Sequence, residues 1–185
     1  MNGRWRRSPA STSRLSKLRL FFALWPPCET AEALHGWALE ARRANGGRVT
    51  RAEAIHLTLA FLGEVDESRL TSLKSISPKS RKHRLPIEEA GYWARNRIVW
   101  VGPYETPKPL ELLAVDLGSE LREQGFRSEK RKFSAHVTLL RKVREPQWLP
   151  RLPAVDWPVE EFVLVRSQLS AQGLRYEIVE RFPLS

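Results

Sequence analysis

Short apolar runs alternate with amphipathic stretches in the first half of the chain, and this pattern predicts interleaved strands and helices. Residues 19–27 (RLFFALWPP) form an apolar run closed by two prolines, which is typical of a buried strand that ends in a turn. A helix is predicted next, because apolar residues recur at the i, i+3, i+4 and i+7 spacing before the NGG of residues 45–47. These residues are Leu34, Trp37, Ala38 and Ala41. A strand is predicted over 54–63 (AIHLTLAFLG), and a second helix over 67–76 with Asp66 as its N-cap.

The second half continues with a hairpin, a helix and three strands. Two strand-like segments, 84–93 and 97–102, flank ARNR and predict the hairpin. The clearest helix ends at Gly125. Its apolar stripe is Leu110, Leu113, Ala114, Leu117 and Leu121. Strands are predicted over 133–140, 160–169 and 175–184, with a proline-rich connection over 146–158. This order favours an α+β domain with largely antiparallel sheets.

One phrase occurs twice in the predicted strands, as HLTLAFLG starting at His56 and as HVTLLR starting at His136. Successive side chains of a strand point to opposite faces, so His56 and Thr58 share one face. The same alternation places His136 and Thr138 together. Each phrase therefore presents an imidazole beside a hydroxyl, and the repeat suggests two similar lobes that each add one such strand to a shared cleft.

Two imidazoles and two hydroxyls around one small volume suit acid and base chemistry at a phosphodiester. Imidazole titrates near neutral pH, so one ring can act as general base while the other acts as general acid. The hydroxyls can donate hydrogen bonds to non-bridging phosphate oxygens. A zinc site is the alternative, but threonine is a poor zinc ligand, and no third histidine, cysteine or carboxylate repeats beside the pair. His35 and His83 have no threonine two residues later and are interpreted as surface or packing residues.

The charge of the chain is concentrated in segments. Of the formal net charge of +10, five charges lie in residues 1–17, a serine-rich leader without acidic residues. We interpret this leader as a disordered basic tail or, alternatively, as a transit peptide, ahead of a single domain over 18–185. Three further basic clusters weakly favour a polyanionic partner such as RNA. They are residues 79–84, 127–132 and 141–144.

The single cysteine, Cys28, excludes a disulfide framework and a cysteine-rich zinc site, and it fits a reducing compartment. No apolar run reaches the roughly 18 residues of a membrane span. We therefore expect a cytoplasmic protein. Nothing in the sequence indicates an oligomer, so we expect a monomer.

Together these phrases resemble those of the two-histidine phosphoesterase superfamily and, within it, the bacterial RNA 2′,3′-cyclic phosphodiesterases, also called 2′-5′ RNA ligases. The resemblance runs from about Arg19 to Leu184 and rests on the order and spacing of RLFFALWPP, HLTLAFLGEV, RIVWVGP, HVTLLR and RYEIVERFPL. It implies an α+β fold in which two pseudo-symmetric lobes of largely antiparallel sheet, with outer helices, line a central cleft. It also implies hydrolysis of RNA 2′,3′-cyclic phosphate ends to 2′-phosphomonoesters without metal or cofactor, and often a reversible 2′-5′ ligation.

The resemblance assigns roles to the repeated residues. His56 would protonate the leaving 3′ oxygen, and His136 would activate the water. Thr58 and Thr138 would hold phosphate oxygens. Arg141, five residues after His136, would offset the negative charge of the transition state.

The first predicted strand contributes two aromatic residues that the resemblance also bears on, Phe21 and Trp25. Phe21 is either a stacking partner for the terminal base or a core residue. Trp25, in LWPP, stands where many relatives carry an acidic residue, and we expect no catalytic role at that position.

Two other functions stay open. A non-enzymatic module of the same fold would hold a nucleotide or RNA in the cleft, although a pure binder has no need of two titrating groups. The second open function is a cyclic phosphodiesterase that acts on a small nucleotide, such as an ADP-ribose cyclic phosphate. The basic clusters favour RNA over such a substrate only weakly.

Overall fold

The computed structural model describes residues 16–127, 133–170 and 173–185. The leader predicted over 1–17 lies outside the described residues except for its last two, and most of the basic cluster 127–132 lies outside them as well. Lys17 opens the first strand, and the Ser16 carbonyl accepts a hydrogen bond from the Glu67 backbone N–H at 3.0 Å. These two residues thus contact the described fold, and the domain boundary expected at residue 18 stays a prediction.

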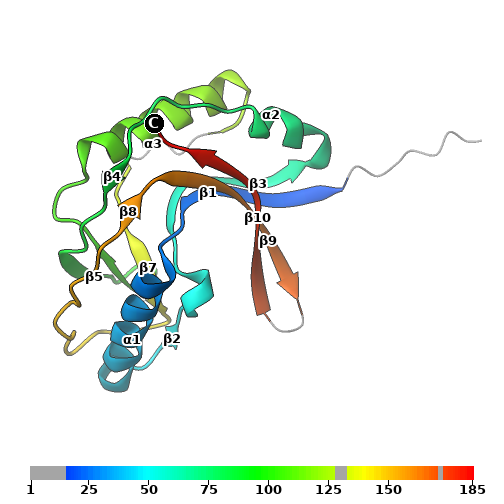
Figure 1. Ribbon diagram of the computed structural model, residues 1–185. Coiled ribbons are helices and arrows are strands. Elements are labelled where there is room, and N and C mark those ends of the chain that lie inside the picture. The colour runs from blue at the N-terminus through cyan, green and yellow to red at the C-terminus, as the bar shows by residue number, and fades with distance from the viewer. Residues whose placement is uncertain (1–15, 128–132, 171–172) are drawn as a thin grey trace, which may run out of the picture.

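The described part of the chain forms one large antiparallel sheet, a two-stranded ribbon and three helices (Figure 1). The strands are β1 (Lys17–Leu24), β2 (Arg48–Val49), β3 (Leu57–Asp66), β4 (His83–Arg84), β5 (Glu89–Trp93), β6 (Ile98–Gly102), β7 (Val137–Arg141), β8 (Pro158–Val159), β9 (Glu161–Ser170) and β10 (Gly173–Pro183). The helices are α1 (Cys28–Asn45), α2 (Leu70–Lys74) and α3 (Lys108–Glu123), with short 3-10 turns η1 (Ala52–Ala54) and η2 (Glu67–Arg69).

The large sheet consists of two halves. One half runs β10-β9-β1-β3 and the other runs β7-β6-β5, with β2 added to β7, and every pairing is antiparallel. Within the described residues, β3 and β7 share one backbone pair, Leu57 with Val137, at the first residue of each strand. Further along β7 its partner is β2, while β3 continues beside β1. The two halves correspond to the two predicted lobes, and the predicted α+β fold is confirmed.

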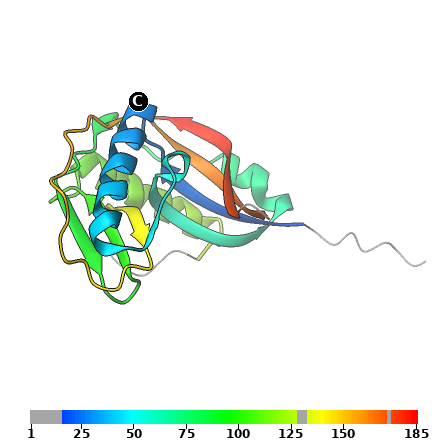
Figure 2. The same cartoon turned by 90° about the horizontal axis from the view of Figure 1, so that it is seen from below.

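The main hydrophobic core spans both halves. The helix α1 follows β1 in the chain but packs against β2 and β7, and α3 follows β6 but packs against β3. Figure 2 shows α1, in blue, beside the yellow β7. The buried stripes agree with the prediction, except that Ala114 is only partly buried. They are Leu34, Trp37, Ala38 and Ala41 of α1, and Leu110, Leu113, Leu117 and Leu121 of α3. Because each helix covers a strand of the other half, the two halves fold as one unit.

The opposite face of the sheet carries a second, smaller apolar cluster. Phe22 of β1 belongs to the main core, whereas Phe21 and Ala23 point to the other side. There they pack with Val163 and Val165 of β9. This alternation along β1 is the one expected for a strand that is buried on both faces.

Three predicted elements are shorter than expected, and one of them, the strand over 133–140, begins only at Val137. The helix over 67–76 consists of η2 and the five-residue α2. The Ser72 and Ser75 hydroxyls donate to carbonyls three residues back, at 2.9 and 2.8 Å, and such bonds compete with helical ones. The strand over 84–93 is divided, since Arg84 belongs to β4 and β5 begins only at Glu89. Pro86 precedes it and has no N–H for a ladder bond.

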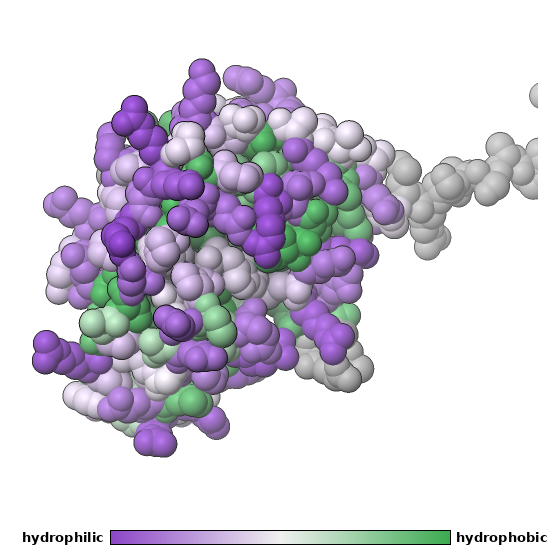
Figure 3. Space-filling model, in the orientation of Figure 1, coloured by the Kyte–Doolittle hydropathy of each residue, from purple (hydrophilic) through white to green (hydrophobic). Residues whose placement is uncertain are grey.

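The surface seen in Figure 3 is mostly hydrophilic, with small hydrophobic patches between the polar side chains. None of the helices in the described residues is long and apolar enough to cross a membrane. The cytoplasmic location expected from the sequence stays a prediction.

Candidate active site

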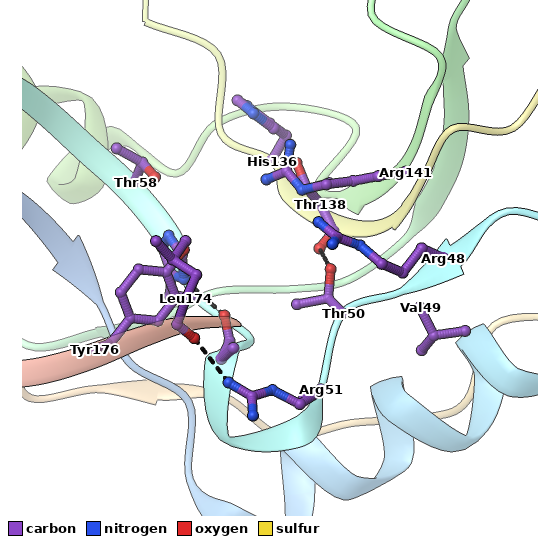
Figure 4. Close-up of a pocket in the computed structure, with 12 residues that line it drawn as sticks. Arg48, Val49, Thr50, Arg51, Thr58, His136, Thr138, Arg141, Leu174 and Tyr176 are labelled. Carbon is purple, nitrogen blue, oxygen red and sulfur yellow. Dashed lines mark hydrogen bonds between the residues drawn. The ribbon is translucent and has the colours of Figure 1, made fainter. Parts of the chain in front are cut away.

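The two H-x-T phrases face one cleft with a volume of about 360 Å³. Its lining residues are Arg48, Val49, Thr50, Arg51, Ala54, His56, Thr58, His136, Thr138, Arg141, Leu174 and Tyr176 (Figure 4). Exposure along the chain alternates as a strand requires, since Leu57 and Leu59 are buried while His56 and Thr58 are partly exposed. The start of β7 alternates in the same way. The structure thus brings together both histidines and both threonines that the sequence analysis selected.

The single pair between β3 and β7 explains how these side chains meet. Leu57 lies opposite Val137 in antiparallel orientation. Each histidine stands one residue before its strand, and each threonine stands one residue inside it. By this register, each histidine lies across from the threonine of the other phrase. The cleft therefore has an approximate two-fold arrangement centred on the Leu57–Val137 pair.

Backbone carbonyls orient both imidazole rings. His56 Nδ1 lies 2.8 Å from the Ala54 carbonyl oxygen, and His136 Nδ1 lies 2.9 Å from the Ser134 carbonyl oxygen. A carbonyl oxygen only accepts hydrogen bonds, so we assign the hydrogen to Nδ1 in both neutral rings. Nε2 is then the nitrogen that gains or loses a proton, as proton transfer to and from one bound group requires.

The His56 ring is enclosed by three aromatic side chains. Trp25 stacks on it with ring centroids 5.2 Å apart and an interplanar angle of 8°. Tyr176 meets the ring edge-on at 5.2 Å, and Phe21 packs at 5.0 Å in a tilted arrangement. The ring is therefore held on several sides by apolar surface that also excludes water.

This enclosure changes the proton affinity of His56. Its pKa is lowered to about 4, chiefly because burial disfavours the charged ring. The hydrogen bond to Ala54 opposes this effect, while the charges of Arg141 and His136 add to it. Burial also raises the pKa of the neighbouring Tyr176 hydroxyl. In the free protein, His56 is therefore neutral at pH 7.

His136 has different surroundings. One aromatic ring, Trp93, meets it edge-on with centroids 4.5 Å apart. Its contact with Ser134 is exposed, whereas that of His56 with Ala54 is partly buried. The two rings thus share a backbone geometry but have different aromatic neighbours.

The cleft carries positive charge. Arg48, Arg51 and Arg141 line it, and none of its described lining residues is acidic. Arg48 lies directly opposite Arg141 across the β2–β7 ladder, where like charges repel. Arg51 is held in place, since it lies 3.3 Å from the Glu53 carboxylate and donates to the Leu174 carbonyl at 2.8 Å. An anion in the cleft would offset the repulsion between the arginines.

The structure places Phe21 behind the cleft. Its ring is 3% exposed, packs in the smaller apolar cluster and contacts His56. In this position it offers no free face to a base, so the core-packing alternative describes it better than the stacking one.

Trp25 lies beside a candidate catalytic residue, with its indole flat against His56. The expectation that this position has no catalytic role stays a prediction. Strand periodicity gave no sign of this contact, because β1 ends at Leu24 and the side chain belongs to the turn that follows.

Sequence reasoning also missed Arg48, Thr50, Arg51 and Tyr176, which line the cleft. The Thr50 hydroxyl donates to the Thr138 carbonyl at 3.0 Å and ties the segment before His56 to β7. The segment RVTR just ahead of the first H-x-T phrase was the available signal. Tyr176 carried no local signal, since its phrase was interpreted only as a strand.

The residues predicted to lie outside the site do so. Neither His35 nor His83 lines the cleft, and their Nδ1 atoms face the carbonyl oxygens of Thr50 and Arg81. Among the described residues, no group of three or more histidine, cysteine, aspartate or glutamate side chains is placed to hold a metal ion. Independence from metal stays a prediction.

One family model matches the chain twice, once in its N-terminal part and once in its C-terminal part. The model of the LigT-like phosphoesterases matches residues 24–100 and again residues 101–176. The first match contains His56 and the second contains His136. The repeated phrase is therefore part of a longer repeat, which agrees with the two-fold arrangement of the cleft.

Individual proteins match over nearly the whole chain. An RNA 2′,3′-cyclic phosphodiesterase of Escherichia coli is 35% identical in an alignment of 171 residues that covers 90% of this chain and 97% of the relative. One from Thermus thermophilus is 33% identical and covers 90% of each chain. The crystal structure of E. coli LigT complexed with 3′-AMP superposes with a TM-score of 0.83 at 34% identity, covering 92% of this chain and 99% of that one. The chain belongs to the LigT-like phosphoesterase family.

Proposed function

We propose that this protein hydrolyses RNA 2′,3′-cyclic phosphate ends to 2′-phosphomonoesters, with His56 and His136 as an acid and base pair and without a metal ion. The observation that carries the proposal is the pair of histidines that line one cleft, each with Nδ1 within hydrogen-bond distance of a backbone carbonyl oxygen. Relatives that match nearly the whole chain are named RNA 2′,3′-cyclic phosphodiesterases.

The reaction requires one proton to be removed and one to be supplied. The base histidine takes a proton from water, whose oxygen attacks phosphorus. The bond from phosphorus to the 3′ oxygen breaks, and the acid histidine gives its proton to that oxygen. A 2′-phosphomonoester and a free 3′ hydroxyl result. In a 2′-5′ ligation a 5′ hydroxyl replaces water as the nucleophile, so the same pair would support it in the same roles. The two histidines exchange roles only in the reverse reaction, the cleavage of the 2′-5′ bond.

The other lining residues suit the phosphate. Thr58 and Thr138 stand beside the histidines and would donate hydrogen bonds to its non-bridging oxygens. Arg141 would offset the negative charge that grows as water attacks. Its guanidinium already acts on the site, because its charge lowers the pKa of His56.

The roles of the two histidines form the finer part of the proposal. The family resemblance makes His56 the acid, but a pKa of about 4 leaves His56 without the acidic proton in the free protein at pH 7. As the acid, His56 would take up a proton together with the anionic substrate, whose charge favours the imidazolium form. A substrate with sulfur in place of the 3′ oxygen separates the roles, because a thiolate leaves without protonation. Replacing the acid histidine then costs much less rate than replacing the base.

Solved structures of E. coli LigT with ATP and with NADP⁺ favour a small nucleotide as a second candidate ligand. A test of the proposal uses an oligoribonucleotide ending in a 2′,3′-cyclic phosphate, incubated with EDTA. Formation of a 2′-phosphate supports the proposal. Formation of a 3′-phosphate contradicts the proposed bond cleavage, and absence of product with tight nucleotide binding supports a binding module.

A further inference from the structure

An apolar stripe runs out of the smaller cluster toward the cleft. On β10, alternate residues Ile178, Tyr176 and Leu174 share one face. Ile178 and Tyr176 pack against the cluster of Phe21 and Val165. Leu174 is the next residue on this face and lines the cleft. The stripe therefore passes from a buried cluster, past His56, to the end of the β9–β10 hairpin.

The outer end of this stripe is exposed. Leu174 is 39% exposed, and its direct partner across the ladder, Leu169 of β9, is 87% exposed. Paired residues of a ladder point to the same face, so the two leucines form one apolar surface. Single exposed leucines are common on protein surfaces, but two that face each other beside a cationic cleft form a patch that suits a ligand.

Polar contacts fix this surface relative to the histidines. The Arg51 guanidinium donates to the Leu174 carbonyl at 2.8 Å and lies 3.3 Å from Glu53, in the turn just ahead of His56. Figure 4 shows this bond crossing from the turn to β10. Tyr176 meets the His56 ring edge-on at 5.2 Å, and Leu174 lies two residues further, about 7 Å along the strand.

We propose that Leu174, Leu169 and the exposed part of Tyr176 form a ledge that binds the base of the nucleotide carrying the cyclic phosphate. The inference rests on the proposed function and names the part of the substrate that this surface would contact. The occupant follows from the position of the ledge beside the cleft. A nucleotide whose phosphate lies at the histidines has its base, a flat apolar surface, within a few ångströms of that phosphate. The leucines have no side-chain hydrogen-bonding group, so the ledge binds all four bases with little discrimination.

The test compares two substrates, adenosine 2′,3′-cyclic phosphate and the 2,3-cyclic phosphate of 1-O-methylribofuranose, which lacks a base. The ratio of their kcat/KM values is measured for the wild type, Leu174→Ser and Leu169→Ser. The matched control is Leu112→Ser, since Leu112 is 47% exposed on α3 and lies outside the cleft. Thermal melting checks that each variant is folded.

We expect Leu174→Ser to lower the ratio about five- to tenfold through KM, Leu169→Ser to lower it less, and Leu112→Ser to leave it unchanged. An unchanged ratio in folded Leu174→Ser, or an equal fall in the control, overturns the ledge. If the wild type turns over neither of these substrates nor the oligoribonucleotide end, the proposed function fails. The ledge is then decided by Kd values for adenosine 2′-phosphate and base-free ribose 2-phosphate. A fall in their ratio in Leu174→Ser supports it, and an unchanged ratio rejects it.

Discussion

Leu57 and Val137 form the one backbone pair between β3 and β7 in the described residues, and the residue ahead of each is a histidine. Both side chains are fully buried in the core. The strands then separate, so the pair lies where the two lobes meet and where the cleft begins. The distance between the histidines is therefore set by the core beneath them, and changes in the backbone close to this junction should affect catalysis.

Gly102 of β6 tests that dependence. A Cβ atom at this position would lie 2.6 Å from the Ala135 carbonyl oxygen and 3.6 Å from the His136 Cα, so Gly102→Ala must displace the segment that carries His136. We expect a loss of about 1–3 kcal/mol in the free energy of unfolding and a fall of about 10- to 100-fold in kcat. Urea unfolding and steady-state kinetics measure both quantities.

Gly36 of α1 is the matched control, since a Cβ there has no neighbour within 4 Å. Gly36→Ala should stabilise the helix by up to about 1 kcal/mol and leave kcat unchanged. Equal kcat values for the two alanine variants would show that the close approach of Gly102 does not position His136.

The lowered pKa of His56 predicts a pH dependence of stability. The unfolded chain binds a proton at His56 near the ordinary pKa of 6.5, whereas the folded protein binds it only near pH 4. Between these values the unfolded state holds more protons, so this histidine stabilises the fold less as the pH falls. The loss amounts to about 3 kcal/mol and is complete below about pH 4.

Denaturant unfolding of the wild type and His56→Gln between pH 7 and pH 4 measures this contribution. The wild type should lose about 3 kcal/mol more than the variant over this range. Parallel curves for the two proteins would mean that His56 titrates normally in the folded state.

Trp25 should influence the same titration through its stacking contact. Trp25→Leu opens one face of the His56 ring to water, and Trp25→Asp adds a carboxylate beside it, so both variants should raise the pKa of His56, the second more. An NMR titration of the His56 ring measures the change. Trp148→Leu is the control, because Trp148 is 54% exposed and lies outside the cleft. A His56 pKa that stays near 4 in Trp25→Leu would show that the stacked indole does not contribute to the lowered pKa.

Arg141 should affect both charge and binding. Arg141→Gln removes a positive charge that lowers the pKa of His56, so that pKa should rise. The variant should also bind inorganic phosphate about tenfold more weakly, as expected when a charged hydrogen bond is lost. Calorimetry measures the affinity. Arg144→Gln serves as the control, since Arg144 lies outside the cleft. Equal phosphate affinity of the two variants would contradict the role given to Arg141.

The parts of the fold that follow from local periodicity were predictable. The stripes on α1 and α3 and the shared face of His56 and Thr58 depend on repeats of 3.6 and two residues, which the sequence displays directly. The family resemblance correctly supplied the bilobal arrangement.

Other features depend on pairings between distant segments, which no local pattern specifies. Nothing in the sequence indicates that β2 takes over from β3 as the partner of β7, and this pairing is what puts Arg48 opposite Arg141. The position of Tyr176 beside His56 depends on the order β9-β1-β3 in the sheet. Phe21 shows a further limit of prediction from the sequence. Periodicity predicts that its side chain lies on one face of a strand, but it does not show whether other residues cover that face.

Single-turnover hydrolysis of an oligoribonucleotide 2′,3′-cyclic phosphate tests the central claim most directly. The variants are His56→Ala, His136→Ala and, as control, His83→Ala, whose Nδ1 also faces a carbonyl two residues earlier, at 2.9 Å, but outside the cleft. With circular dichroism confirming folded proteins, we expect the first two to lose about 10²- to 10⁴-fold in rate and His83→Ala to keep the wild-type rate. Near wild-type hydrolysis by either folded His56→Ala or His136→Ala would contradict catalysis by the pair.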